Sequence, residues 1–217
     1  KCYKKLMINK DTKIYGSFSN NPGNNGCKFF NKKFQENNIN AIYKSFYSNN
    51  IKKSIEAVKN LDIKGFAISM PFKVKILKYL DEIDEAVNII GACNTVVNNK
   101  GKLKGYNTDW VGVLNFIKTN ELNFTRIKQQ GKINIIGNGG FSKAIQYTCN
   151  ILNIKYNVIT RDKMNLVSNL EGITLNATPL DIKGVKQLID CRPFTKQGKI
   201  IALLQAEEQY KIYTNVS

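Results

Sequence analysis

The sequence contains no histidine among its 217 residues. Histidine is the side chain that most often takes up and releases protons near neutral pH, so any proton transfer by this protein must use another group. One candidate is Lys73, which stands directly behind Pro71 and Phe72 in the stretch AISMPFKVKIL (67–77). The alternative is that Lys73 is one of thirty lysines without a special role.

Metal ligands and membrane segments are scarce as well. The cysteines are odd in number, scattered and without a C-x-x-C pair, and they stand at positions 2, 27, 93, 149 and 191. Without histidine partners, this pattern argues against a zinc site and a disulfide framework, so we expect no metal and a reducing cytoplasmic location. The sequence has no run of about 18 apolar residues and no apolar N-terminal run typical of a signal peptide, so we expect no membrane partner.

Arginine is also rare, although the formal net charge is +17. Clustered cations would suit a nucleic-acid partner, because they neutralise phosphates and release counterions. The basic residues are, however, 30 Lys and only 3 Arg, and Arg is the residue preferred for bidentate contacts with phosphate and guanine. The lysines are spread along the chain beside many Asn and Ile residues, a pattern typical of drift in an AT-rich genome. We therefore expect no nucleic-acid partner.

The apolar periodicity predicts alternating strands and helices, and hence an α/β fold with a mostly parallel sheet. Strands are expected at 12–19, 41–47, 65–70, 156–160 and within 172–180, and a hairpin at 94–107. Helices are expected at 27–38, 49–61, 72–83, 110–120 and 201–214, and the segment 132–152 reads as strand, glycine turn and helix. The polar segment 119–130 is the natural boundary between two domains.

The glycine turn lies in INIIGNGGFSKA, where Gly137, Gly139 and Gly140 stand between an apolar strand and a helix. Glycines allow the backbone to approach a pyrophosphate closely, and the helix N-terminus supplies N–H groups and partial positive charge. Ser142 replaces the third glycine of the G-x-G-x-x-G pattern and is small enough for helix–strand packing. The turn therefore predicts a dinucleotide site; the alternative is a tight βα turn without a ligand.

Arg161 stands at the end of the next predicted strand. An acidic residue at such a position would bind the ribose 2′-hydroxyl of NAD, whereas an arginine accommodates the 2′-phosphate of NADP. Asp162 follows directly, so NAD stays possible, but we expect NADP.

Two further stretches, GACNTVVN (91–98) and GYNTDW (105–110), each place an Asn-Thr pair beside Gly or Asp. Asn and Thr side chains supply both donors and acceptors, as binding of a polyhydroxylated ligand requires. Taken singly, such pairs are mostly turn residues, and Asp109 could simply cap the helix that begins at Trp110.

Taken together, SMPFK, GACNTVV, GYNTDW, GNGGFSKA, NAT and the terminal LLQAEEQYKIYT occur in the order found in shikimate dehydrogenases. The chain resembles this family from about residue 7 to 214. The opening MINKDTKIYGSFSNNPGNNGCKFFNKKF is closer still to the bacterial shikimate dehydrogenase-like branch, which carries a P-G-N loop.

The resemblance implies an N-terminal α/β substrate domain, a Rossmann-like NADP-binding domain and a C-terminal helix that returns to the first domain. In this chain those would be residues 1–118 with 201–217, and residues 119–200. The family reduces 3-dehydroshikimate reversibly to shikimate, a step of aromatic amino acid biosynthesis in the chorismate pathway.

The resemblance also assigns residue roles. The lysine of the family's P-F-K motif falls on Lys73 and the aspartate of its N-T-D motif on Asp109, which would form the catalytic pair. Hydrogen bonds to the substrate are implied for Asn25, Cys27, Ser69, Asn94, Asn107 and Gln205. Cofactor contacts are implied for Gly137, Asn138, Gly139, Gly140, Phe141 and Arg161.

The chain departs from the family in two places. Typical members bind the substrate carboxylate with an S-x-S pair, where this chain has Asn25 and Cys27, and a thiol is a poor hydrogen-bond donor. The segment between Arg161 and the last helix is also short, so either the cofactor domain is reduced or stretches near 161–172 and 179–200 are absent. A family tyrosine that touches substrate has no clear match there, and Cys191 lies near its place.

These departures leave alternatives open. The first is an enzyme acting on shikimate, quinate or a related cyclic polyol acid, as a monomer or homodimer. The second is a catalytically weak paralogue that binds a dinucleotide for regulation or assembly.

Overall fold

The computed structural model describes residues 8–119, 125, 127, 129 and 131–215. Cys2 and most of the polar segment 119–130 lie outside the described residues. The chain divides into two compact units, which are residues 1–107 with 209–217 (unit 1) and residues 108–208 (unit 2). Each unit has its own sheet and its own core, so the expected two-domain α/β architecture is confirmed.

Unit 1 contains a mixed sheet in the order β2-β1-β3-β5-β6-β4. Its strands are β1 (Lys13–Ser19), β2 (Ala41–Tyr47), β3 (Gly65–Ile68), β4 (Glu82–Ile83), β5 (Thr95–Asn99) and β6 (Lys102–Tyr106). β1 pairs in parallel with β2 and β3, whereas β5 runs antiparallel to β3 and β6. β4 pairs in parallel with β6, so β5 is the one strand of this sheet that runs against the others. The expectation of a mostly parallel sheet is therefore confirmed for unit 1, with β5 of the β5–β6 hairpin as the exception.

The helices of unit 1 are α1 (Asn25–Glu36), α2 (Ile51–Asn60), the 3-10 helix η1 (Lys75–Tyr79) and α3 (Glu85–Ile90). The helix expected at 72–83 is wrong. Beyond η1, the backbone N–H of Asp81 donates to the Leu103 carbonyl at 2.9 Å, and Glu82 and Ile83 then pair with β6. Pairing with the sheet therefore overrides the helical spacing of the apolar residues there.

Two apolar layers cover the sheet of unit 1. Ile51, Ile55 and Val58 of α2 pack into a cluster with Phe18 and Phe66 of the sheet. On α1, Phe30 stacks on Tyr43 of β2 with ring centroids 4.4 Å apart, and Phe34 lies 5.3 Å from Tyr15 of β1. Aromatic pairs at such distances add to the stability gained from burial alone.

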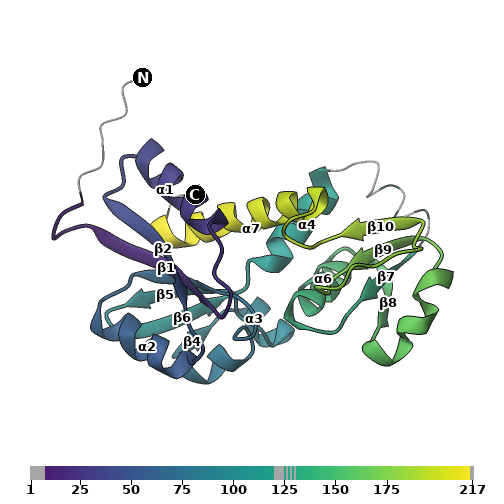
Figure 1. The fold of residues 1–217 in the computed structure, drawn as a ribbon, viewed down its shortest axis with the longest axis horizontal. Helices are drawn as coiled ribbons and strands as arrows, with labels where there is room; N and C mark the ends of the chain where they lie inside the picture. The colour runs from purple at the N-terminus through teal and green to yellow at the C-terminus, as the bar shows by residue number, and fades with distance from the viewer. Residues whose placement is uncertain (1–7, 120–124, 126, 128, 130, 216–217) are drawn as a thin grey trace. The chain divides into compact units, whose positions relative to one another are not determined.

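Unit 2 contains a four-stranded, all-parallel sheet in the order β10-β9-β7-β8 (Figure 1). Its strands are β7 (Lys132–Ile136), β8 (Lys155–Ile159), β9 (Ile173–Asn176) and β10 (Gln187–Asp190). Its described helices are α4 (Asp109–Thr119), α6 (Gly140–Ile151), the 3-10 helix η2 (Arg161–Asn169) and the start of α7 (Lys196–Thr214). The last residues of α7, from Gln209, belong to unit 1, so the C-terminal helix returns to the first unit as expected.

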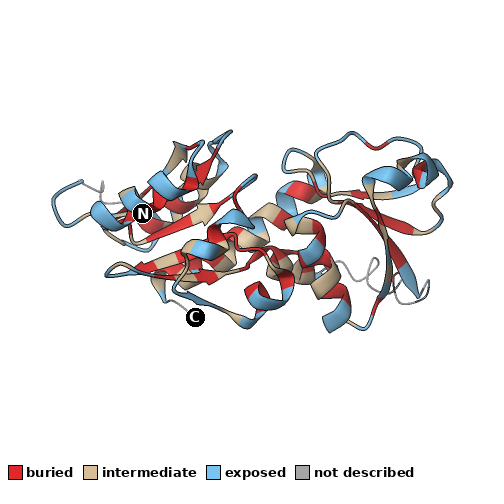
Figure 2. Cartoon of the chain, turned by 90° about the horizontal axis from the view of Figure 1, so that it is seen from below, coloured by how far each residue is buried: buried red, intermediate tan, exposed pale blue. Residues whose placement is uncertain are grey.

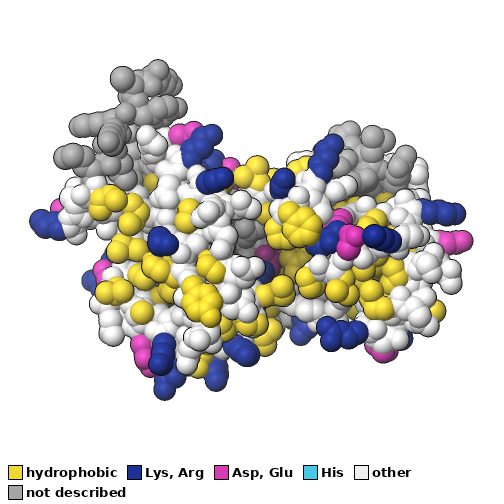
Figure 3. Space-filling view, viewed as in Figure 1, with side chains coloured by type: hydrophobic (Ala, Val, Ile, Leu, Met, Phe, Trp, Pro, Cys, Tyr) yellow, Lys and Arg dark blue, Asp and Glu magenta, His cyan; other side chains and the backbone are white. Residues whose placement is uncertain are grey.

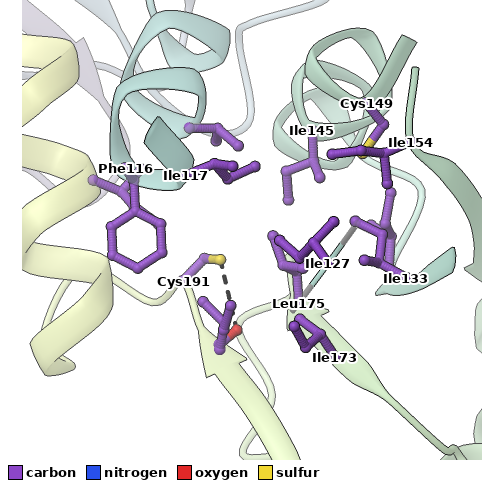
Figure 4. Packing of buried hydrophobic residues seen from close by; sticks show 14 residues of the cluster. Phe116, Ile117, Ile127, Ile133, Ile145, Cys149, Ile154, Ile173, Leu175 and Cys191 are labelled. Atoms are coloured by element: carbon purple, nitrogen blue, oxygen red, sulfur yellow. Dashed lines mark hydrogen bonds between the residues drawn. The ribbon is translucent and has the colours of Figure 1, made fainter. Parts of the chain in front are cut away.

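The core of unit 2 contains apolar side chains from the helices α4 and α6 and from the sheet. Phe116 and Ile117 of α4, Ile145 of α6 and Leu175 of β9 belong to one buried cluster (Figure 4). Ile201 of α7 belongs to the same cluster. Figure 2 shows buried residues following the strands of both sheets.

The first boundary between the units lies at 107/108, earlier than the expected 118/119. The second lies at 208/209, later than the expected 200/201. α4 lies within unit 2 because its apolar residues pack into that core, and α7 contributes Ile201 to the core before it enters unit 1. Between Arg161 and α7 the chain runs continuously through η2, β9 and β10.

On the face shown in Figure 3, Lys and Arg side chains lie at several separate places and form no continuous stripe. Within the described ranges, no helix is long and apolar enough to cross a bilayer.

The hydroxyl of Tyr213 offers a test of packing in unit 1. It is buried and has no hydrogen-bond partner among the described residues, whereas the Tyr15 hydroxyl donates to the Tyr213 carbonyl at 3.1 Å. Because a buried polar group without a partner is costly, Tyr213→Phe should stabilise the protein by about 1 kcal/mol. Urea unfolding followed by circular dichroism measures the change.

The matched control is Tyr15→Phe, which removes a hydroxyl that does have a partner. It should lower the unfolding free energy by about 1 kcal/mol. A loss of stability in both variants would contradict this description of the Tyr213 hydroxyl.

Candidate functional site

Three of the predicted substrate residues lie at one end of the strands of the unit 1 sheet, where β3 and β6 end and β5 begins. β3 ends at Ile68, whose N–H donates to the Asn94 carbonyl at 2.8 Å, and the Asn94 N–H donates to the Tyr106 carbonyl at 3.2 Å. Ser69, Asn94 and Asn107 therefore follow or precede neighbouring strands at the same end. We call this end, with Ser69, Lys73, Asn94 and Asn107, the polar edge.

Lys73 is attached to the polar edge by its backbone. It follows the cis Met70–Pro71 bond, and its carbonyl accepts from the Cys93 N–H at 2.8 Å. Burial raises the pKa of the Cys93 thiol to about 12, although the nearby positive charge of Lys73 acts in the opposite direction. The Lys73 side chain is half-buried, which distinguishes it from its exposed neighbour Lys75.

Asn94 and Asn107 are buried, at 3% and 2% exposure. The Asn107 side-chain amide donates to the Ala92 carbonyl at 2.8 Å, and Asn94 Oδ1 accepts from the Thr95 hydroxyl at 3.0 Å. Buried carboxamides with such partners keep fixed orientations, as ligand recognition requires. Ser69 is exposed, and its carbonyl accepts from the Phe72 N–H at 2.9 Å.

Asn25 and Cys27 lie in the first turn of α1. Asn25 is exposed, whereas Cys27 is half-buried with its Sγ 3.3 Å from Ser45 Oγ of β2. α1 follows β1 and runs back along the sheet, so its N-terminus lies toward the carboxyl end of β1. The chain thus offers an amide, a thiol and the Ser45 hydroxyl near the place of the family's two serines.

Asp109 and Gln205 belong to unit 2. Asp109 is the first residue of α4 and is 5% exposed. The Thr108 hydroxyl donates to Gln205 Oε1 of α7 at 3.1 Å. A Cβ at Gly112 would lie 2.8 Å from the Ile201 carbonyl, so glycine lets α4 and α7 approach closely. Lys73 lies in unit 1, and its pairing with Asp109 stays a prediction.

The glycine turn follows β7 and opens α6, as the sequence predicts. Gly137 has φ +105°, a conformation that favours glycine, and its N–H donates to the Ile159 carbonyl at 2.9 Å. The buried Ser142 hydroxyl donates to the Gly137 carbonyl at 2.7 Å, which ties the helix to the turn. Asn138 is exposed, and Phe141 packs against the core of unit 2.

This turn fits the pyrophosphate of a dinucleotide. No described atom lies within 4 Å of a Cβ built at Gly139, the residue that precedes α6, so the space beside the helix N-terminus is open. Gly140 begins a helix of 12 residues, and the residue at its N-cap, Gly139, has no side chain that could cap the first N–H groups. Such N–H groups bind phosphate oxygens.

Arg161 is exposed at the start of η2, directly after β8. Its neighbour Asp162 accepts a hydrogen bond from the Thr160 hydroxyl at 2.5 Å. That hydrogen bond lowers the pKa of Asp162. The carboxylate is thus bound to its own loop, which weakens the case for a ribose contact by Asp162.

The sequence patterns did not indicate Gln209. They placed Cys191 near the position of a family tyrosine that touches substrate, whereas the structure places it in a hydrophobic core. Gln209 is 3% exposed and donates to the Thr95 hydroxyl, next to Asn94 of the polar edge. Thr95 is 114 positions away in the sequence, so no local pattern indicates this partner. Cys191 belongs to the core of unit 2 (Figure 4), where burial raises its pKa to about 12. Its side chain therefore does not take over the role of a ligand-binding tyrosine.

Comparison with known proteins gives consistent matches. A family model described as the shikimate dehydrogenase substrate binding domain matches residues 26–96. The shikimate dehydrogenase-like protein of Haemophilus influenzae is 30% identical over an alignment of 257 positions, gaps included, which covers 96% of this chain and 93% of that protein. The shikimate dehydrogenase (NADP(+)) of Pyrococcus furiosus is 42% identical over 144 residues, 65% of this chain and 51% of its own length. The solved structure of a shikimate 5-dehydrogenase-like protein has a TM-score of 0.77 at 28% identity, covering 97% of this chain and 94% of that one.

The two glycines of the turn should respond differently to alanine. A Cβ at Gly137 would meet Thr178 Cγ2 at 2.8 Å in a backbone conformation with φ +105°, so Gly137→Ala should destabilise unit 2 by about 1–3 kcal/mol. Gly139→Ala places its methyl in open space and should leave stability unchanged. Thermal unfolding measures the stability of both variants, and an equal loss of stability in the two would contradict the geometry of the turn.

Proposed function

Since the chain belongs to the shikimate dehydrogenase family, we propose that it is an NADP-dependent oxidoreductase. It would transfer a hydride reversibly between the nicotinamide and C3 of shikimate, quinate or a related cyclic polyol acid. The observation that carries the proposal is the polar edge, where Ser69, Lys73, Asn94 and Asn107 follow or precede neighbouring strands. The relative from Pyrococcus furiosus, named a shikimate dehydrogenase (NADP(+)), lends it further support.

The proton is the part of the reaction that this chain's own residues must manage. Oxidation of a C3 hydroxyl releases a proton from its oxygen, and the Lys73 amine would take it up there, since the chain has no histidine. Asp109 would orient the ammonium that forms and share its proton. In the reverse direction Lys73 would return the proton to the carbonyl oxygen.

The polar edge would orient the ring. Asn94 and Asn107 are buried and held by hydrogen bonds, so their carboxamides would cost little entropy to bind ring hydroxyls. Ser69 and Gln205 would supply further hydrogen bonds. Near α1, Asn25 would donate to the substrate carboxylate, with Cys27 and the Ser45 hydroxyl beside it. These residue types differ from the family's serines, so we include related acids among the substrates.

NADP, when bound, supplies the carbon that accepts or gives the hydride. The residues that would hold it are Gly137, Asn138, Gly139, Gly140 and Phe141 at the turn, and Arg161 at the end of β8. The backbone N–H groups of the turn would bind the pyrophosphate, and the Arg161 guanidinium would bind the 2′-phosphate.

A second candidate is a catalytically weak paralogue that binds the dinucleotide for a regulatory purpose. Two observations favour it. The described sheet of unit 2 has four strands, and Cys191 is turned into the core near the place of the family's substrate-binding tyrosine. Turnover separates the two candidates.

Replacement of the proposed base tests the reaction. Lys73→Ala should lower kcat for shikimate oxidation by about 10²–10⁴-fold, the range that general acid–base catalysis contributes. Absorbance of the reduced nicotinamide measures the rate. Lys75→Ala, at an exposed neighbour, is the control and should keep wild-type turnover. Full activity of a folded Lys73→Ala variant would reject the assignment of the base.

Cofactor choice depends on Arg161 in this proposal. Arg161→Gln should raise the Kd of NADP about tenfold and leave that of NAD unchanged, because the 2′-phosphate loses a charged hydrogen-bond donor. Fluorescence titration with each dinucleotide gives both constants. Lys163→Gln, at an exposed position two residues on, controls for general loss of positive charge. Equal weakening by both variants would speak against a specific role of Arg161.

A further inference from the structure

The side chain of Gln209 connects the C-terminal helix to the polar edge. Its Nε2 donates to Thr95 Oγ1 at 2.8 Å and to the Asn94 carbonyl at 3.3 Å. All three residues belong to unit 1, and all are buried, with Thr95 at 0% exposure. In water-excluded surroundings such hydrogen bonds fix side chains in one arrangement.

The Thr95 hydroxyl links Gln209 to the Asn94 side chain. It accepts from Gln209 and donates to Asn94 Oδ1 at 3.0 Å. A hydroxyl has a single proton, so acceptance from Gln209 leaves that proton for Asn94. A directed chain of hydrogen bonds therefore runs from Gln209 through Thr95 to the carboxamide oxygen of Asn94.

This chain decides which end of the Asn94 carboxamide faces a ligand. Oδ1 is directed toward Thr95, and because the amide is planar, Nδ2 is directed away from Thr95. Nδ2 can only donate. A ligand group at this position must then present an acceptor, such as a hydroxyl oxygen with its lone pair toward Asn94.

We infer that Gln209 is a positioning residue that acts through Thr95 to fix Asn94 as a hydrogen-bond donor toward a substrate hydroxyl oxygen. The inference rests on the proposed function, which assigns Asn94 to the substrate. It adds a residue to the site and a direction to one of its hydrogen bonds.

The rival explanation is that Gln209 only fastens α7 to unit 1. The Asn94 carbonyl also accepts from the Ile68 N–H at 2.8 Å, so it keeps a partner without Gln209. A fastening role would lower stability and affect substrate binding whether or not Asn94 is present. A positioning role requires Asn94.

A double-mutant cycle separates these explanations. Gln209→Leu should raise KM for shikimate about tenfold, the worth of one well-oriented buried hydrogen bond, and change kcat less than about twofold. In an Asn94→Ala background, the same substitution should change KM less than about twofold. Equal effects of Gln209→Leu in both backgrounds would overturn the inference.

Conservative variants sharpen the result. Thr95→Val keeps the shape of the side chain but removes the hydroxyl, and should match Gln209→Leu. Thr95→Ser keeps the hydroxyl and should restore KM to within about threefold of wild type. Gln35→Leu, at an exposed position of α1, is the control and should leave KM unchanged.

A measurement without substrate keeps the inference separate from the proposed function. The side-chain NH₂ resonances of Asn94, identified by their loss in Asn94→Ala, should shift in Gln209→Leu and Thr95→Val but not in Gln35→Leu. A shift in a protein without turnover would support the hydrogen-bond chain and reject the proposed function. Turnover without the shift would reject the chain alone.

Discussion

The hydrogen bonds that join β3, β5 and β6 are the constraint on which the site depends. Through them Asn94 is fixed between Ile68 and Tyr106, so residues 25 and 38 positions from Ser69 in the sequence arrive at the same sheet edge. A shift of this register by one residue would turn every side chain of the strand to the other face. The polar edge thus depends on the same pairing that buries Phe66 and Val96 in the core.

The site proposed for the dinucleotide in unit 2 depends on a different set of local features. A positive-φ glycine ends β7, a buried serine ties the turn to α6, and open space lies beside the helix N-terminus. These features need only the first βα unit of a parallel sheet, and not its full width. A four-stranded sheet can therefore keep the backbone groups that suit a pyrophosphate.

Local patterns predicted the glycine turn and the hairpin, because each depends on residues close in sequence, such as Lys100 and Gly101 with positive φ. They failed for 72–83 and did not indicate β10, where pairing with distant strands decides the structure. The hydrogen bonds of Gln209 join residues 114 and 115 positions apart, which no spacing predicts. The roles proposed for Lys73 and Asp109 came from the resemblance to a family, since a lysine or an aspartate alone indicates no reaction.

The central claim is that this chain transfers a hydride from a ring carbon to a nicotinamide. The most direct test is to incubate it with NADP and either shikimate or quinate that carries deuterium at C3, and to analyse the reduced cofactor by mass spectrometry. We predict that the deuterium is found in the reduced nicotinamide. Binding of NADP without any transfer of deuterium would contradict the claim and leave a dinucleotide-binding protein without this chemistry.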